Sequence, residues 1–255
     1  MPKIWRMKDS SDRFTKDKGA LWDLPMRLAL IGRTGAGKTS VLGNLLLRPD
    51  MYRGDWEGPD CYVFSGSLDG DAKLKTIIDQ LEIPESNLFQ GFSDQVLHVI
   101  YEQIVERYNE AIEEHKTPSH SLILIDDCSF GGALARNGAK NDALQRVCLN
   151  GRKYLVSVIV TSQKYSQVST TVRENLSGAM IAPATAKQID LIAGDWNYLA
   201  DKNAFKDLFR RQTEGSHDYF VADIAHPAVY LDHQFRPLPD LLEEKKRLAE
   251  HGSAA

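Results

Sequence analysis

The chain has 255 residues, of which 42% are hydrophobic, and a formal net charge of −4. This length and composition suit one or two globular domains, and the mild acidity excludes a surface that is basic throughout. The chain has three cysteines without a Cys-x-x-Cys pair, and its histidines are scattered, so we expect neither a disulfide framework nor a Cys/His metal site. Its apolar runs are too short to cross a membrane. We therefore expect an intracellular protein.

The first 20 residues are predicted to form a basic arm. Residues 1–18 carry six lysines and arginines against three aspartates, and they show little periodicity. This composition is typical of a solvated, partly disordered arm, with a contact to nucleic acid or to another subunit as the alternative. No repeat or linker divides the remainder, so we expect one domain over residues 21–240 and a short tail over 241–255.

Residues 32–39 read Gly-Arg-Thr-Gly-Ala-Gly-Lys-Thr, a complete G-x-x-x-x-G-K-[ST] phosphate-binding loop. A strand-like segment, residues 26–31, precedes it, and a helix-compatible segment, residues 39–47, follows it. The glycines let backbone N–H groups face the phosphates at the amino end of that helix. We therefore predict that ATP is bound by Gly32, Arg33, Thr34, Gly35, Ala36, Gly37, Lys38, Thr39 and Ser40.

The downstream elements alternate between strands and helices. Apolar runs predict strands over residues 61–65, 121–125, 155–160 and 179–181, with a closing pair over 218–223 and 229–235. Three-to-four spacing and stop signals predict helices over 71–81, 94–114, 141–150, 170–175, 186–192 and 203–212, whereas residues 83–91 are mixed. This order predicts a three-layer α/β fold with a mainly parallel central sheet and antiparallel strands at its C-terminal edge.

The apolar strand over residues 121–125 ends in two carboxylates, Asp126 and Asp127. Downstream of a phosphate loop, this pattern is typical of a Walker B motif. We expect Asp126 and the Thr39 hydroxyl to hold Mg²⁺ while Lys38 contacts the β- and γ-phosphates. Asp127 would orient and polarise the attacking water without binding the metal. A solvated Asp-Asp turn is the alternative.

The strand over residues 155–160 is followed by Thr161, Ser162 and Gln163. Polar side chains at the carboxyl end of such a strand lie where ligands bind in open α/β folds. In NTPases with an additional central strand, this strand lies between those that carry the phosphate loop and the acidic pair. Gln163 would then face the γ-phosphate, and a polar strand end without a ligand is the alternative.

Three segments carry a family resemblance: GRTGAGKTS at 32–40, LILIDDC at 122–128, and NGRKYLVSVIVTSQKYSQVSTTVREN at 150–175. Together they resemble the genome-packaging ATPases of large double-stranded DNA viruses, a viral branch of the FtsK/HerA-like P-loop translocases. The resemblance spans roughly residues 26–182. It implies an additional-strand P-loop NTPase fold and ATP hydrolysis with Mg²⁺.

The same resemblance implies an assembly and partners. It implies a ring of five or six subunits that pumps double-stranded DNA of any sequence toward a capsid vertex or portal component. Such a protein would act inside the host cell, in the cytoplasm or nucleus, and its retention in the virion is left open. It also implies an arginine supplied to the neighbour's nucleotide. Arg152 is the first candidate, Arg173 and Arg146 are the alternatives, and an ordinary surface charge is the competing interpretation for each.

The contact with DNA has two candidate segments. Residues 129–140 are Gly-rich, follow the acidic pair directly and carry Arg136 and Lys140. A loop so connected to the hydrolytic strand could act as a pore loop, with an ordinary surface loop as the alternative. Lys164 and Tyr165, just past the central strand, are the second candidate pair.

One residue departs from many NTPases of this layout, which have Glu at the position of Asp127. The shorter side chain requires the water to approach more closely or the strand end to shift. Paired Asp occurs within the viral family, so we still expect activity, and slow turnover of the isolated protein would be compatible with this residue.

Two other functions stay open. One is a P-loop kinase in which Arg210 and Arg211 belong to a phosphate-closing lid; the other is a non-catalytic scaffold that binds ATP for assembly.

Overall fold

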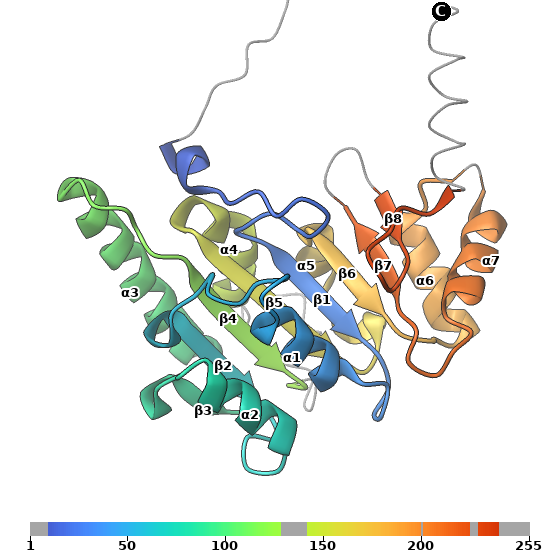
Figure 1. Cartoon of the computed structure of the whole chain (residues 1–255), viewed down its shortest axis with the longest axis horizontal. Helices are drawn as coiled ribbons and strands as arrows, with labels where there is room; N and C mark the ends of the chain where they lie inside the picture. Colours follow the sequence, from blue (N-terminus) through green and yellow to red (C-terminus); the bar gives the residue numbers. More distant parts are fainter. Residues whose placement is uncertain (1–9, 129–141, 200, 225–228, 240–255) are drawn as a thin grey trace, which may run out of the picture.

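The computed structural model describes residues 10–128, 142–199, 201–224 and 229–239, and within these ranges the strands form one eight-stranded sheet (Figure 1). The order across the sheet is β3-β2-β4-β5-β1-β6-β7-β8. The first six strands are parallel, and β7 and β8 pair in antiparallel fashion at the C-terminal edge. The strands are β1 (Arg27–Ile31), β2 (Cys61–Ser65), β3 (Leu88–Gln90), β4 (Ser121–Asp126), β5 (Val156–Ser162), β6 (Gly178–Ile181), β7 (Phe220–Asp223) and β8 (Val229–Leu231).

Helices cover both faces of the sheet, which gives the three-layer α/β architecture predicted from the sequence. One face packs against α1 (Lys38–Leu47) and α2 (Ala72–Gln80). The other face packs against α3 (Asp94–Glu113), α4 (Asp142–Asn150), α5 (Thr170–Glu174), α6 (Ala186–Trp196) and α7 (Lys202–Gln212). Short 3-10 turns connect them: η1 (Ser10–Phe14), η2 (Gly58–Asp60), η3 (Glu85–Asn87), η4 (Gly151–Tyr154) and η5 (Tyr165–Gln167).

The two layers follow from the alternation of side chains along the strands. In β1, Leu28 and Leu30 join the core under α1, whereas Ala29 and Ile31 join the core on the opposite face. All six residues of β4 are buried, as expected for a strand covered on both sides. A continuous apolar run therefore marks a central strand of this sheet.

The position of β5 confirms the additional-strand layout. It pairs with β4 on one side and with β1 on the other, both in parallel. Because parallel strands end at the same edge, the segments that follow β1, β4 and β5 are brought together there. The phosphate loop, the acidic pair and Gln163 follow these three strands.

Several predicted boundaries differ from the structure. Residues 83–91, whose sequence pattern is mixed, contain the edge strand β3. The strand predicted over 229–235 ends at Leu231, because Asp232 then accepts backbone hydrogen bonds from Gln234 and Arg236 and forms a turn. The helix predicted over 186–192 continues to Trp196.

The described part of the N-terminal segment packs on the domain. Lys16 pairs with Leu24 through backbone hydrogen bonds, and the ammonium groups of Lys16 and Lys18 lie 3.2 and 2.6 Å from the Asp55 carboxylate. Residues 1–9 and the predicted tail over 241–255 lie outside the described residues. Across the described ranges, no helix is both long and apolar enough to cross a bilayer.

Candidate active site

The phosphate loop connects β1 to α1 and is tightly confined. Gly35 and Gly37 adopt the left-handed region, with φ of +80° and +91°. Gly32 donates its N–H to the Ser162 carbonyl at the end of β5, at 3.0 Å. A Cβ on Gly32 would lie 2.8 Å from the Cβ of Ala182 and 2.9 Å from that of Ala36. The backbone thus takes a path that only glycine allows at these positions.

Lys38 opens α1 and is 9% exposed. Its Nζ donates to the Gly32 carbonyl at 2.8 Å, which holds the ammonium inside the curve of the loop. The loop is also held by Tyr219, whose hydroxyl donates to the Ala36 carbonyl at 2.7 Å. Burial raises the pKa of Tyr219 to about 12, so this hydroxyl keeps its proton as a donor. Lys38 therefore lies where the loop motif predicts it.

The first turn of α1 is tied to α2. The Thr39 hydroxyl donates to Asp71 Oδ2 at 3.1 Å, and Lys73 Nζ donates to Ser40 Oγ at 2.7 Å. Asp71 also caps α2 through the N–H groups of Lys73 and Leu74. The predicted metal ligand Thr39 thus has a carboxylate partner that belongs to neither sequence motif.

Asp126 ends β4 and is 3% exposed. Its oxygens accept hydrogen bonds from Thr161 Oγ1 at 2.7 Å and from Ser65 Oγ at 3.2 Å. Burial raises its pKa, these hydrogen bonds act in the opposite direction, and the charges of Asp127 and Asp71 raise it further. A nearby cation stabilises the charged form of a carboxylate that is buried and close to other negative charges.

The donor atoms present fit Mg²⁺ held jointly with a nucleotide. Thr39 and Asp126 offer hard oxygen atoms, and Mg²⁺ is commonly bound by one or two protein oxygens together with substrate phosphates. Within the described residues no group of three or more His, Cys, Asp or Glu side chains forms a metal site of its own. Phosphate oxygens and water molecules are the usual further ligands of such an ion.

Asp127 lies just past β4 in the left-handed region, with φ of +46°. Its N–H donates to Thr161 Oγ1 at 2.9 Å. Gln163 Nε2, from the end of β5, lies 3.3 and 3.1 Å from the two oxygens of the Asp127 carboxylate. The structure thus brings together the two residues that were predicted to act on the water and the γ-phosphate.

The three candidate arginines lie elsewhere. Arg152 is in η4, before β5, and so lies at the sheet edge opposite the phosphate loop; its guanidinium contacts Asp12 at 3.4 Å. Arg173 pairs with Asp195, and Arg146 Nη2 lies 2.9 Å from Glu102 Oε1. Among the described side chains, these arginines are not brought together with Lys38, Asp126 and Gln163.

Three residues that contact the site were not predicted: Ser65, Asp71 and Tyr219. Thr161 was expected at this sheet edge, and the structure adds its hydrogen bond to Asp126. Ser65 carries a similar signal, because it too is a polar residue at the carboxyl end of an apolar strand. Asp71 precedes a helix and could have been predicted as its cap. Tyr219 is 183 residues from Ala36 and carries no local signal.

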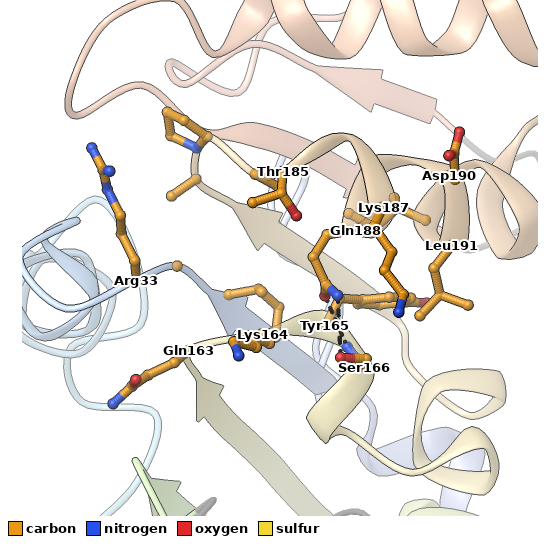
Figure 2. Close-up of a pocket in the computed structure, with 16 residues that line it drawn as sticks. Arg33, Gln163, Lys164, Tyr165, Ser166, Thr185, Lys187, Gln188, Asp190 and Leu191 are labelled. Carbon is orange, nitrogen blue, oxygen red and sulfur yellow. Dashed lines mark hydrogen bonds between the residues drawn. The ribbon is translucent and has the colours of Figure 1, made fainter.

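A cavity of about 960 Å³ adjoins the phosphate loop (Figure 2). It lies between the segment after β5 and the start of α6, which are joined by two hydrogen bonds between Ser166 and Gln188, at 3.1 and 3.2 Å. Lys164 and Tyr165, the second candidate pair for the contact with DNA, both line it. The Tyr165 side chain is buried, and its hydroxyl donates to Asp195. The other candidate segment, residues 129–140 with Arg136 and Lys140, lies outside the described residues.

The sheet order, with β5 between the strands that precede the phosphate loop and the acidic pair, defines the fold of an additional-strand P-loop NTPase. No family model matches the sequence, and no curated protein matches it significantly. Solved structures do match in fold. The DNA-packaging ATPase B204 of Sulfolobus turreted icosahedral virus superposes with a TM-score of 0.56 at 12% identity, over 82% of this chain and 97% of that one.

Two further structures extend this comparison. The genome-packaging NTPase B204 of Sulfolobus turreted icosahedral virus 2, in complex with AMPPCP, has a TM-score of 0.54 at 11% identity, over 82% of this chain and 96% of that one. ATPases 2 and 3 of EssC from Geobacillus thermodenitrificans give 0.53 at 15% identity, over 89% of this chain and 43% of that one. The family resemblance inferred from the motifs is thus matched in fold.

Proposed function

We propose that this protein hydrolyses ATP to translocate double-stranded DNA into a viral capsid. The observation that carries the proposal is the meeting of Lys38, Asp126, Asp127 and Gln163 at one sheet edge, with the Gln163 amide 3.1 Å from the Asp127 carboxylate. Support for DNA as the substrate comes from the solved genome-packaging and DNA-packaging ATPases with this fold, and the capsid is what the family resemblance implies.

Each group of site residues would have a separate role in ATP hydrolysis. Backbone N–H groups of the phosphate loop and the Lys38 ammonium would bind the phosphates. Thr39 and Asp126 would hold Mg²⁺, which when bound neutralises charge on the phosphates. Asp127 would orient the attacking water and accept its proton, and Gln163 would hold the Asp127 carboxylate in place at the end of β5.

The partners follow from the same proposal. A translocase must contact phosphates rather than base edges, since it moves along any sequence. We place the protein in a ring of five or six copies that works at a capsid vertex or portal inside the host cell. Each copy would supply Arg152, or else Arg173 or Arg146, to the nucleotide of its neighbour.

Phosphate release from ATP tests the proposed chemistry. We expect the wild-type protein to release inorganic phosphate faster with duplex DNA than without it, and Lys38→Ala and Asp127→Asn to lower the rate by at least about 10²-fold. Thermal unfolding checks that both variants fold. Undiminished release by Lys38→Ala would contradict the proposal.

Two further results would distinguish the alternative functions from ATP-driven translocation. Transfer of the phosphoryl group to an acceptor instead of water would indicate a kinase. Biological activity that survives Asp127→Asn but not Lys38→Ala would indicate a scaffold that needs ATP only as a ligand.

A further inference from the structure

Asp71, in the connection between β2 and α2, uses its two carboxylate oxygens for separate contacts. Oδ1 accepts the N–H groups of Lys73 and Leu74, at 2.9 and 3.1 Å, and so caps α2. Oδ2 accepts the Thr39 hydroxyl at 3.1 Å. The second contact is not needed for the cap, and it reaches across to the first turn of α1.

A hydroxyl that gives a lone pair to a cation keeps its proton, and that proton needs an acceptor. The acceptor fixes the rotation of the hydroxyl and therefore the direction of its lone pairs. For Thr39 the acceptor is Asp71. The Asp126 oxygens are engaged with Thr161 and Ser65 instead.

The contact between Thr39 and Asp71 is supported by its surroundings. The neighbouring pair, Lys73 Nζ and Ser40 Oγ at 2.7 Å, joins the same two helix starts. Two side-chain contacts thus join the start of α1 to the start of α2, and Asp71 makes the one that involves the expected metal ligand Thr39.

We propose that Asp71 is a positioning residue of the magnesium site: it accepts the Thr39 proton and thereby directs the Thr39 oxygen toward the Mg²⁺ that accompanies the nucleotide. The inference rests on the proposed nucleotide binding. It adds a residue outside both sequence motifs, and it makes the connection between β2 and α2 part of the site.

Asp71→Asn separates the two contacts of this side chain. The asparagine carbonyl preserves the α2 cap, because Asn caps helices as well as Asp does. Its amide nitrogen cannot accept the Thr39 proton. Asp69→Asn is the matched control, since it removes the same charge from an exposed position in the same connection.

The measurement is the affinity for a fluorescent ATP analogue, titrated with Mg²⁺ and with excess chelator. We expect the gain in affinity that Mg²⁺ gives to fall about 10-fold in Asp71→Asn, as is typical when an outer partner of a metal ligand is lost. Affinity in chelator and the melting temperature should stay at wild-type values. Asp69→Asn should match the wild type throughout.

The outcomes are distinct. An unchanged Mg²⁺ effect in Asp71→Asn would overturn the inference, as would equal losses of affinity with and without Mg²⁺, which would indicate a purely structural role. A wild-type protein that binds no nucleotide under either condition would overturn the proposed function itself, and the inference with it.

Discussion

The Asp126 carboxylate is almost fully buried at the end of β4, and burial raises its pKa above the ordinary value of 3.8. Between that value and the raised pKa, the folded chain binds more protons than the unfolded chain does. The free energy of unfolding therefore falls as the pH rises through this window. At neutral pH the charged carboxylate costs stability, which a bound cation would recover.

Asp126→Asn should therefore stabilise the nucleotide-free protein. We expect the free energy of unfolding at pH 7 to rise by about 0.5–2 kcal/mol, because the amide has no charge to bury and can retain partners in Thr161 and Ser65. The gain should shrink as the pH falls through the raised pKa and vanish below 3.8, where Asp126 is protonated in both the folded and the unfolded chain. Urea unfolding at several pH values measures this, and a variant less stable than wild type at pH 7 would contradict it.

Some residues of the site could be predicted from the sequence, and others could not. Lys38, Asp126, Asp127 and Gln163 were predictable because each lies in a local pattern that reflects its chemistry. Tyr219 was not, because its contact with the Ala36 carbonyl depends on β7 returning to the phosphate loop. Contacts between distant segments leave no trace in local spacing.

At the scale of elements, the central strands were the most predictable. β4 and β5 are buried on both faces, so their sequences are continuous apolar runs. The strands at the edge of the sheet were less predictable. β3 has three residues, none of them buried, and its pairing with β2 rather than its own composition makes it a strand.

The start of β6 is packed against the segment that precedes β1. A Cβ on Gly178 would lie 1.9 Å from Trp22 Nε1 and 2.5 Å from the Ala222 carbonyl oxygen. We expect Gly178→Ala to lower the free energy of unfolding by about 1–3 kcal/mol, as overpacking typically does. Gly70→Ala, where no neighbour lies within 4 Å, is the control. Equal stability of the two variants in urea would show that Trp22 does not pack there.

At the scale of the whole molecule, Arg152 lies at the sheet edge opposite the phosphate loop, with its side chain 56% exposed. An arginine placed there cannot serve the nucleotide of its own subunit. If it serves a neighbour, one copy must present this edge to the phosphate loop of the next, as the proposed ring requires. Arg173, by contrast, is 11% exposed and paired with Asp195.

A mixing experiment tests this arrangement. Arg152→Ala should lower ATP hydrolysis by about 10³-fold or more, as loss of a finger does. Mixing Arg152→Ala with the inactive Lys38→Ala should restore part of the activity, because each variant supplies what the other lacks. No recovery on mixing, in samples that form mixed assemblies, would remove Arg152 from this role and leave Arg173 and Arg146 to be tested in the same way.

ATP-driven displacement of a third strand from a DNA triplex tests translocation most directly. We expect displacement with ATP and Mg²⁺ on duplexes of unrelated sequence, and none with AMPPCP or with Lys38→Ala. The rate should fall with rising salt, as expected of contacts to phosphates. Rapid ATP hydrolysis on the same DNA without any displacement would contradict the assignment as a translocase.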